Sequence, residues 1–322
     1  MIRKILTIIE NSRSFLVVGH GSPDGDAIGS TLALAHALKE MGKEVVAYNQ
    51  DPLPNNFRFL PGAEMMTGEL PAGKRFDAGF VLDAGELKRA GKDVPGACGL
   101  LVNVDHHPFS ENFGAAYLVD TSASATGIMI YRILKEAGHP ISLPVATCIY
   151  TAITADTGSF RYSNANPEAF RVAGELVGLG VDPWAVAGVL YESQERQRLE
   201  LLALALSTLE VSRSGLWASV SVTTDMYERT GSCAELTDGF VNYPRSIRGV
   251  EVALFFRQLE ADSFKVGFRS KGQIDVGALS RSLGGGGHHN AAGAIVKGSL
   301  DEVRRQVGET LDALLAGEAR GS

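Results

Sequence analysis

The sequence predicts an α/β protein whose first half builds a mostly parallel sheet with helices on both faces. Short apolar runs rich in Val, Leu and Phe alternate with stretches of helical character, and this alternation is typical of strand–helix–strand units in parallel sheets. Strands are expected in this half at residues 15–19, 45–48, 76–82 and 101–104. Helices are expected at residues 124–137, 143–153 and 167–178.

The second half changes pattern and predicts a smaller α/β domain. Strands are expected at residues 216–222, 250–256, 264–268 and 293–296, followed by a closing helix at residues 300–315. Before them, four leucines show the three–four–three spacing of one helical face, at Leu199, Leu202, Leu206 and Leu209. We expect this helix to join two domains, with residues 1–190 as the first domain, 191–211 as a helical linker and 212–322 as the second domain. The alternative that the helix belongs to one core stays open.

Composition narrows the class of protein. The 322 residues include 30 basic and 37 acidic side chains, a net charge of −7, which argues against a grip on long duplex nucleic acid through many phosphate contacts. A short anion can still bind if metal ions supply positive charge. The three cysteines are odd in number and widely spaced, which does not indicate a disulfide framework or a Cys-based zinc site. Without a signal-peptide core or an apolar run of about 18 residues, we expect a cytoplasmic protein with no membrane partner.

Potential metal ligands follow several of the predicted strands and one apolar helix. Taken singly, each is explained equally well by a capped turn. Because parallel strands bring their carboxyl ends to the same edge of a sheet, we expect these side chains to gather there. They are His20, Asp24 and Asp26 in the first strand-to-helix loop, Asp83 after the third strand, Asp105, His106 and His107 at the end of the fourth, and Asp156 at the end of the helix over residues 143–153.

Such a gathering of carboxylates predicts bound cations. Four or more carboxylates in one pocket repel each other and raise each other's pKa unless positive charge neutralises them. Mixed imidazole and carboxylate ligands suit a transition metal such as Mn²⁺ better than Mg²⁺, because imidazole is the softer donor. The number of candidate ligands is sufficient for two ions that share one bridging carboxylate.

These motifs resemble a known family in order and context. The four clusters of ligands are similar to the four motifs of the DHH phosphoesterase superfamily, and the glycine-rich segment 284–293, with its two histidines, looks like the signature of the DHHA1 domain. Together they span nearly the whole chain. Their combination resembles the NrnA-type oligoribonuclease and pAp-phosphatase branch more than the long RecJ exonucleases or the family-II inorganic pyrophosphatases.

The resemblance implies a Rossmann-like first domain and a role for each candidate ligand. By analogy, two divalent ions would bind, Mn²⁺ first, with Mg²⁺ or Co²⁺ as alternatives. One ion would be held by His20, Asp24 and Asp83, and the other by Asp26, Asp83, His106 and Asp156. His107 would face the scissile phosphate, and Asp105 would orient a histidine. One departure is Ile128, which stands where many relatives carry a Glu.

The second domain is expected to grip substrate. A run of glycines lets backbone N–H groups approach a phosphate closely, although glycine runs are also common as flexible connectors. With the resemblance, we expect Arg269 to bind one phosphate and the glycine loop with His288 to bind another. The candidate substrate-binding residues are Arg269, Ser270, Gly285, Gly286, Gly287 and His288.

The expected activity is a two-metal phosphodiesterase with phosphomonoesterase capability. Two ions would lower the pKa of a bridging water and clamp the phosphoryl oxygens. The expected substrates and partners are short single-stranded oligoribonucleotides, pApA and 3′-phosphoadenosine 5′-phosphate, and a homodimer is compatible with the sequence. One alternative is an exopolyphosphatase-like hydrolase of polyphosphate or another small phosphate ester. A second alternative is a nucleotide-binding regulatory module that has lost turnover.

Overall fold

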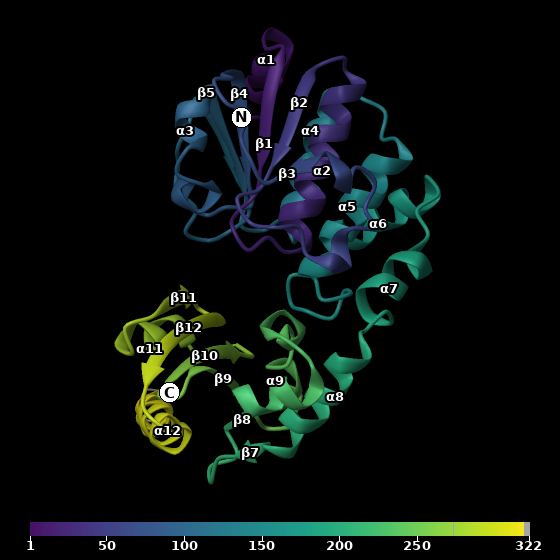
Figure 1. The fold of residues 1–322 in the computed structure, drawn as a ribbon. Helices are drawn as coiled ribbons and strands as arrows, with labels where there is room; N and C mark the ends of the chain where they lie inside the picture. Colours follow the sequence, from purple (N-terminus) through teal and green to yellow (C-terminus); the bar gives the residue numbers. More distant parts are fainter. Residues whose placement is uncertain (273, 319–322) are drawn as a thin grey trace. The chain divides into compact units, whose positions relative to one another are not determined.

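The computed structural model describes residues 1–272 and 274–318, which form two compact units that divide between Ser193 and Gln194 (Figure 1). The strands of the first unit are β1 (Ser14–Val18), β2 (Glu44–Tyr48), β3 (Met66–Thr67), β4 (Phe76–Leu82), β5 (Cys98–Asp105) and β6 (Ala116–Val119). Its α-helices are α1 (Ile2–Asn11), α2 (Gly25–Glu40), α3 (Val94–Ala97), α4 (Thr126–Glu136), α5 (Leu143–Asp156), α6 (Pro167–Gly178) and α7 (Pro183–Tyr191).

The sheet of the first unit is parallel throughout its described strands, in the order β3-β2-β1-β4-β5-β6. The chain starts in the middle, moves to one edge and then returns to build the other side. Strand order therefore reverses between β1 and β4. In open α/β sheets this reversal leaves a crevice at the carboxyl ends of the two strands, where ligands bind.

Both faces of this sheet are covered, as the apolar strands require. Alternate side chains of a strand point to opposite faces. Phe15 and Val17 of β1 pack in the core with α1, α2, α4 and α5, whereas Leu16 and Val18 pack in a second cluster with Val94 of α3. Figure 1 shows α2, α4 and α5 on one side of the strands and α3 on the other. The predicted mostly parallel sheet with helices on both faces is confirmed.

Glycines allow the three helices on one face to approach closely. A Cβ at Gly29 of α2 would lie 2.6 Å from the carbonyl oxygen of Cys148 in α5. A Cβ at Gly127 of α4 would lie 2.6 Å from the Cβ of Ala152 in α5. Real Cβ atoms do not approach other atoms this closely, so both positions require glycine. This packing brings the amino ends of α2 and α4 beside the carboxyl end of α5.

The four strands and three helices expected in this half are present, but further elements are not among the predictions. Strand β3 has two residues and β6 has four, which is too short for a periodic pattern to mark them. Helix α7 begins at Pro183, where no helix is among the predictions, although residues 180–183 have the composition of a turn. Proline at the first position of a helix costs no hydrogen bond, so a turn signal and a helix start are hard to distinguish there.

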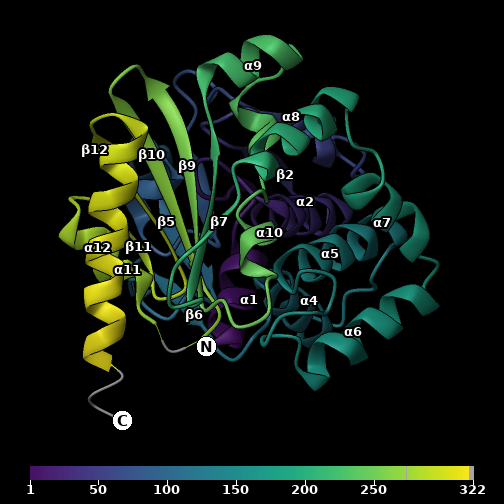
Figure 2. The same cartoon turned by 90° about the horizontal axis from the view of Figure 1, so that it is seen from below.

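The second unit contains one mixed sheet among its described residues, in the order β11-β12-β10-β9-β8-β7 (Figures 1 and 2). Only the β8–β9 pair is parallel within this described sheet. Its strands are β7 (Glu210–Val211), β8 (Trp217–Val222), β9 (Val252–Glu260), β10 (Ser263–Ser270), β11 (Gly286–His288) and β12 (Ala291–Lys297). Its α-helices are α8 (Arg196–Ser207), α9 (Thr224–Thr230), α10 (Asn242–Arg245), α11 (Val276–Ser282) and α12 (Leu300–Glu318). A 3₁₀ turn of this unit lies at Ala234–Thr237. In the first unit, 3₁₀ turns lie at Asn55–Phe57, Ala63–Met65 and Leu87–Ala90.

Helices α11 and α12 pack on one face of this sheet, and Figure 2 shows α12 lying along it. Helix α8, the helix expected between the domains, packs with its own unit. Leu201 and Ala205 are buried against Val222 and Phe240, whereas Leu199 of the leucine stripe is exposed. No single helix in the described chain is both long and apolar enough to cross a membrane; α6 and α7, bent by 114° at the break between them, meet that test only as a pair.

Candidate metal centre and active site

His20 and Asp24 lie in the loop that leads from β1 into α2. The Nδ1 of His20 is 2.8 Å from the carbonyl oxygen of Gly21, so this nitrogen carries the proton and Nε2 keeps its lone pair. Asp24 caps α2, because its Oδ1 accepts the backbone N–H groups of Asp26 and Ala27 at 3.1 Å each. The other oxygen of Asp24, Oδ2, lies 3.8 Å from His20 Nε2. The loop therefore presents one imidazole lone pair and one carboxylate oxygen to the same point.

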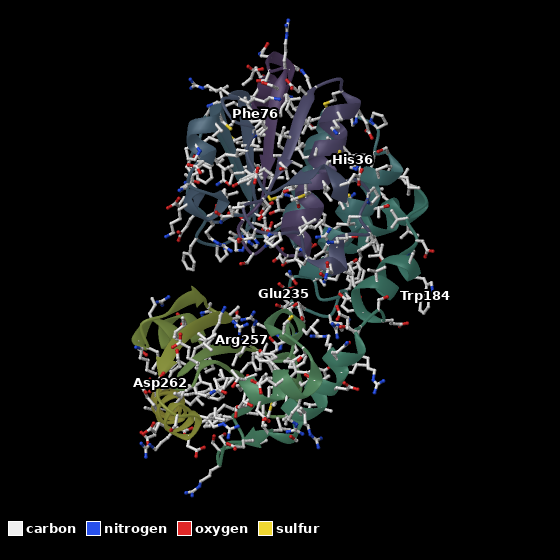
Figure 3. The ribbon with its side chains drawn as sticks, in the orientation of Figure 1. His36, Phe76, Trp184, Glu235, Arg257 and Asp262 are labelled. Atoms are coloured by element: carbon white, nitrogen blue, oxygen red, sulfur yellow. The ribbon has the colours of Figure 1, made fainter. Side chains whose placement is uncertain are left out.

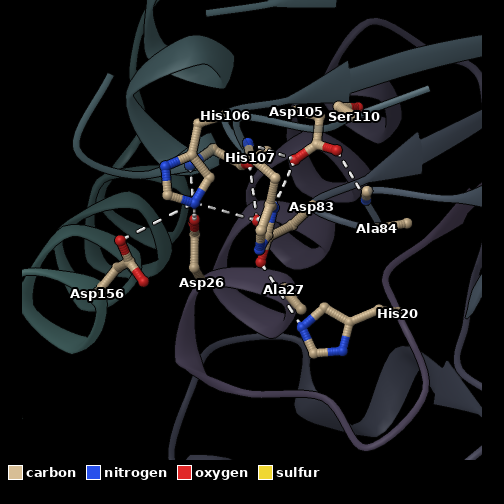
Figure 4. A network of polar contacts seen from close by, with 12 residues as sticks. His20, Asp26, Ala27, Asp83, Ala84, Asp105, His106, His107, Ser110 and Asp156 are labelled. Carbon is tan, nitrogen blue, oxygen red and sulfur yellow. Dashed lines mark hydrogen bonds and ion pairs between the residues drawn. The ribbon is translucent and has the colours of Figure 1, made fainter. Parts of the chain in front are cut away.

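Asp83 occupies the centre of the cluster (Figure 4). It follows β4 with a φ of +58°, a left-handed conformation that Asp tolerates better than most residues and that often marks functional positions. Its Oδ1 lies 3.4 Å from His106 Nε2, and its Oδ2 lies 3.8 Å from His20 Nε2. The two oxygens of one buried carboxylate thus face two histidines from different loops, which is the geometry of a bridging ligand.

Asp26 is fixed by the amino end of α4. Its Oδ2 accepts the backbone N–H of Thr126 at 2.6 Å, and its Oδ1 accepts that of Gly127 at 3.0 Å and the Ser30 hydroxyl at 2.9 Å. Free N–H groups at a helix amino end favour a negative charge. Oδ2 also lies 3.7 Å from His106 Nε2. The close packing of α2 and α4 therefore positions this carboxylate toward the histidine.

His106 and Asp156 complete the second half of the cluster. His106 Nδ1 lies 3.1 Å from the carbonyl oxygen of Ala123, which leaves Nε2 as the ligating atom. Asp156 ends α5, and its Oδ2 lies 3.9 Å from His106 Nε2. The same oxygen accepts a hydrogen bond of 2.9 Å from the side-chain amide of Asn164. Asn164 also donates to the carbonyl oxygens of Ser124 and Asp156, so it holds the carboxylate in place.

His107 and Asp105 form a separate pair beside the cluster. Asp105 ends β5 and is buried, with Oδ2 accepting the backbone N–H of Gly85 at 2.7 Å. Its Oδ1 lies 2.7 Å from His107 Nδ1. Burial alone would lower the pKa of His107, but the hydrogen bond that its ring donates to Asp105 and the charge of Asp83 raise this pKa. In the reverse direction, His107 lowers the pKa of Asp105 to about 2 against the effect of burial. The pair therefore favours a protonated His107.

The spacing of the donor atoms fits shared cations. The nitrogen–oxygen separations of 3.4 to 3.9 Å exceed hydrogen-bond lengths. They approach the ~3.0 to 3.4 Å expected between donors that each bind one ion at about 2.1 Å. Among the described residues, two groups have ligand atoms close enough for one ion: His20 with Asp24 and Asp83, and Asp83 with His106 and His107.

The second of these groups includes His107 rather than Asp26 and Asp156. The Nδ1 of His107 already bonds to Asp105 at 2.7 Å, whereas oxygens of Asp26 and Asp156 surround His106 Nε2. We therefore favour Asp26 and Asp156 as partners of His106. We call the set His20, Asp24, Asp26, Asp83, His106 and Asp156 the metal cluster.

The pKa values of the metal cluster are shifted because several negative charges lie close together. Burial, together with the charge of Asp83, raises the pKa of Asp26 well above its ordinary range. Burial raises the pKa of Asp156 to about 7, with Asp83 and Asp24 acting in the same direction. Burial would lower the pKa of His106, but Asp83, Asp26 and Asp156 raise it to about 11. Protons thus supply the positive charge that the cluster needs, and divalent cations can take their place.

Several positioning groups were missed by reasoning from sequence. The backbone N–H groups of Thr126 and Gly127 have no sequence signature as ligand holders. Ser30 does carry a signal, because it lies four residues after Asp26 on the same helix face. Asn164 shows no such spacing. Ile128, the departure from the family pattern, is buried in the apolar core, so it makes no polar contact with the metal cluster.

The candidate substrate-binding residues of the second unit lie at one end of its sheet. Arg269 and Ser270 end β10, and the Ser270 hydroxyl accepts a hydrogen bond of 2.8 Å from Asn290. Gly286 and Gly287 were expected in a loop but form edge strand β11 with His288, paired with β12. The side chain of His288 lies outside the described structure.

Close packing explains part of the glycine run. A Cβ at Gly285 would lie 2.3 Å from the carbonyl oxygen of Gly293, and one at Gly287 would lie 2.4 Å from the Cα of Ala292. The N–H of Gly285 donates to the carbonyl oxygen of Ser280 at 2.8 Å. This N–H therefore already has a partner, and the role of Gly285 in binding substrate stays a prediction. Glycine is required here because β12 passes so close.

Comparison with known proteins agrees with this geometry. Residues 14–153 match the N-terminal domain of the DHH family, and residues 229–316 match the DHHA1 domain. A bifunctional oligoribonuclease and PAP phosphatase NrnA from Thermus thermophilus is 36% identical over 97% of this chain and 92% of its own length. The chain belongs to the DHH family of phosphoesterases. The Bacillus subtilis protein of the same name is 30% identical to this phosphoesterase over 89% of the chain and 90% of its own length.

Solved structures extend the likeness to the fold. An exopolyphosphatase-related protein from Bacteroides fragilis matches this DHH phosphoesterase with a TM-score of 0.90 and 28% identity, over 98% of this chain and 95% of that one. RecJ from Thermus thermophilus in complex with Mn²⁺ matches with a TM-score of 0.55 at 13% identity, covering 98% of this chain and 54% of RecJ. At that identity the likeness concerns the fold alone. Family membership and the metal cluster together make this chain a metal-dependent phosphoesterase.

Proposed function

We propose that this phosphoesterase hydrolyses short oligoribonucleotides, pApA and 3′-phosphoadenosine 5′-phosphate with two bound Mn²⁺ ions. The substrates follow from the names of the two relatives at 30% and 36% identity. The observation that carries the proposal is the position of Asp83, whose two oxygens face His20 and His106. A centre for two adjacent ions needs one ligand that can bind both of them, and a carboxylate between two histidines can do so.

The residues of the metal cluster divide into two ligand sets. In this proposal His20, Asp24 and Asp83 hold one ion, and Asp26, Asp83, His106 and Asp156 hold the other. Imidazole donors mixed with carboxylates favour Mn²⁺ over Mg²⁺, with Co²⁺ as a further candidate. When bound, such a pair of ions activates a water for attack and neutralises phosphoryl oxygens. The protein fixes the ligands in advance through the Gly21, Ala123 and Asn164 contacts described above.

His107 is proposed to act on the substrate directly. Asp105 holds its Nδ1 at 2.7 Å, which orients the ring and keeps it protonated. A protonated imidazole beside the scissile phosphate can donate a proton to the leaving oxygen or stabilise charge on the phosphoryl group. Asp105 acts through His107 and is a positioning residue in this proposal.

The second unit is proposed to bind the rest of the substrate. The candidate residues for this grip remain Arg269, Ser270, Gly285, Gly286, Gly287 and His288. The net charge of −7 favours short substrates, which need few phosphate contacts, over long duplex nucleic acid. The division into a catalytic and a substrate-binding domain, a cytoplasmic location and a homodimer stay predictions from the sequence.

A second candidate function is hydrolysis of polyphosphate. It is favoured by the Bacteroides fragilis structure, whose protein is called exopolyphosphatase-related. A regulatory module without turnover is the least favoured alternative, because every expected ligand lies in the metal cluster.

Turnover of matched substrates tests the proposal. With Mn²⁺ present, we expect release of AMP from pApA and of phosphate from 3′-phosphoadenosine 5′-phosphate, and little release from tripolyphosphate. Faster turnover of tripolyphosphate than of pApA would favour the second candidate. Tight nucleotide binding with no product from any of these substrates would favour the regulatory module.

A further inference from the structure

Phe109 is the most exposed large apolar side chain in the described part of the chain, with 79% of its surface open to solvent. Burial of an aromatic ring lowers the free energy of the folded protein considerably, and the ring of Phe109 does not make this contribution. Single exposed apolar residues are common on protein surfaces, so exposure alone assigns no role. Two further features distinguish Phe109, namely its distance from His107 and the rigidity of its backbone.

Phe109 occupies the third position of a tight turn that begins at His107. The N–H of Ser110 donates to the carbonyl oxygen of His107 at 3.2 Å, which closes a four-residue turn. Pro108 stands at the second position, where its fixed φ is favoured. Two peptide steps separate Phe109 from His107, so their Cα atoms are at most about 7.6 Å apart. The backbone that carries the exposed ring therefore lies next to the residue proposed to face the phosphate.

Hydrogen bonds to β5 and to the loop after β4 also hold the turn in place. The side-chain amide of Asn103, which is fully buried in β5, donates to the Ser110 hydroxyl at 3.2 Å and to the carbonyl oxygen of Glu111 at 2.8 Å. The N–H of Glu111 donates to the carbonyl oxygen of Gly85 at 2.8 Å, and its carboxylate accepts the N–H of Leu87 at 3.2 Å. These bonds tie the turn to the loop that follows β4. An exposed ring on so fixed a backbone is preorganised for contact with a ligand.

The chemistry of the ring points to one occupant. A phenyl ring has an apolar π-face and no charge or hydrogen-bonding group, so it attracts a flat, uncharged ring and offers nothing to a phosphate chain. The base of a nucleotide lies one sugar away from its phosphate, which matches the two-residue step from His107 to Phe109. Stacking of this kind tolerates any base, because every base has a π-face. We propose that Phe109 stacks on a nucleobase of the substrate and makes this enzyme select nucleotides over base-free phosphate esters.

This inference rests on the proposed function and adds the nucleobase as a recognised element. Its test compares pApA with an abasic counterpart that has the same sugar–phosphate chain, in wild type and in Phe109→Ala, Phe109→Leu and Phe109→Trp. Loss of one stacking contact should raise the KM for pApA about 5- to 160-fold in Phe109→Ala. The kcat should stay within about twofold, and the KM for the abasic compound should not change. Phe109→Leu should be intermediate, and Phe109→Trp should retain the wild-type KM.

A matched control is Trp184 of α7, which Figure 3 labels and which is 70% exposed. Trp184→Ala should leave both KM values unchanged. A KM for pApA that stays at the wild-type value in Phe109→Ala would overturn the inference, and so would an equal rise for both compounds, because that would indicate a distorted turn. Failure of the proposed function is read separately, from wild type that hydrolyses neither pApA nor 3′-phosphoadenosine 5′-phosphate. In that event 3′-phosphoadenosine 5′-phosphate should quench the fluorescence of Phe109→Trp in a Trp184→Phe background. The baseline is Trp184→Phe alone, in which Trp217 is the remaining tryptophan. Equal quenching in both proteins would mean that the base does not stack on position 109.

Discussion

Replacing Asp83 by alanine removes the one carboxylate that faces both His20 and His106. Loss of a group that merely orients a ligand lowers metal affinity about 10- to 100-fold, so loss of a shared ligand should lower it at least 100-fold. At a Mn²⁺ concentration 100 times the wild-type Kd, binding stabilises the folded protein by about 2.7 kcal/mol. The same concentration equals the Kd of the variant and stabilises it by only about 0.4 kcal/mol.

The assay measures metal content after gel filtration, the Mn²⁺-induced rise in Tm, and turnover of pApA. Asp83→Ala should bind at least one ion fewer than wild type. Its Mn²⁺-induced rise in Tm should be much smaller, and it should show essentially no turnover of pApA. A matched control is Asp77→Ala, because Asp77 lies near the start of the same strand and accepts the N–H groups of Arg13 and Ser14 instead. That control should bind Mn²⁺ normally. Two ions per chain and a wild-type rate in Asp83→Ala would refute the bridging geometry.

Three further changes test other parts of the site. Asn164→Leu removes the amide that holds Asp156 and should weaken Mn²⁺ binding about 10- to 100-fold, measured from the Mn²⁺ dependence of turnover. His107→Asn should lower kcat about 10²- to 10⁴-fold with both ions retained, measured by turnover and elemental analysis. Below about pH 4, metal-free wild type should lose stability through protonation of Asp120, because hydrogen bonds from Ser122, and then from Arg132, lower the pKa of Asp120 from 3.8 to about 2. This stabilisation is present above pH 3.8 and is lost as the pH falls toward 2, so the slope of Tm against pH in this range should be smaller in Asp120→Asn.

Each of these expectations has a contrary outcome. Normal Mn²⁺ dependence in Asn164→Leu would mean that Asp156 holds its position without help. Loss of an ion from His107→Asn would favour His107 as a ligand in place of Asp26 or Asp156. An unchanged slope in Asp120→Asn would mean that the partly buried pair of Asp120 and Arg132 adds no measurable stability, as is found for many ion pairs near the surface.

Sequence reasoning located the candidate ligands because each follows an apolar strand or helix whose end is easy to see. The strand over residues 101–104 and the three polar residues after it, for example, predict where Asp105, His106 and His107 must lie. The backbone donors at Thr126 and Gly127 could not be found in this way, since an N–H group is the same in almost every residue. Their role depends on how closely α4 approaches α2, which is a tertiary property.

The glycine run of the second unit could be predicted only in part. Its composition predicted a loop whose backbone approaches a phosphate, because glycine has no Cβ. In the structure Gly286 and Gly287 lie in strand β11, and a Cβ at Gly285 or Gly287 would collide with β12. The spacing of the residues carries no information about that neighbour, so the sequence could not show that packing also requires glycine here.

The close contact between Gly29 and Cys148 also affects the candidate metal site. Asp26 stands at the start of α2 and Asp156 at the end of α5, so the distance between these two helices helps to set the distance between two proposed ligands. A Cβ at position 29 would lie 2.6 Å from the carbonyl oxygen of Cys148, so any larger residue there would force the helices apart and move Asp26 relative to Asp156. A residue that touches none of the candidate ligands therefore constrains how far apart two of them lie.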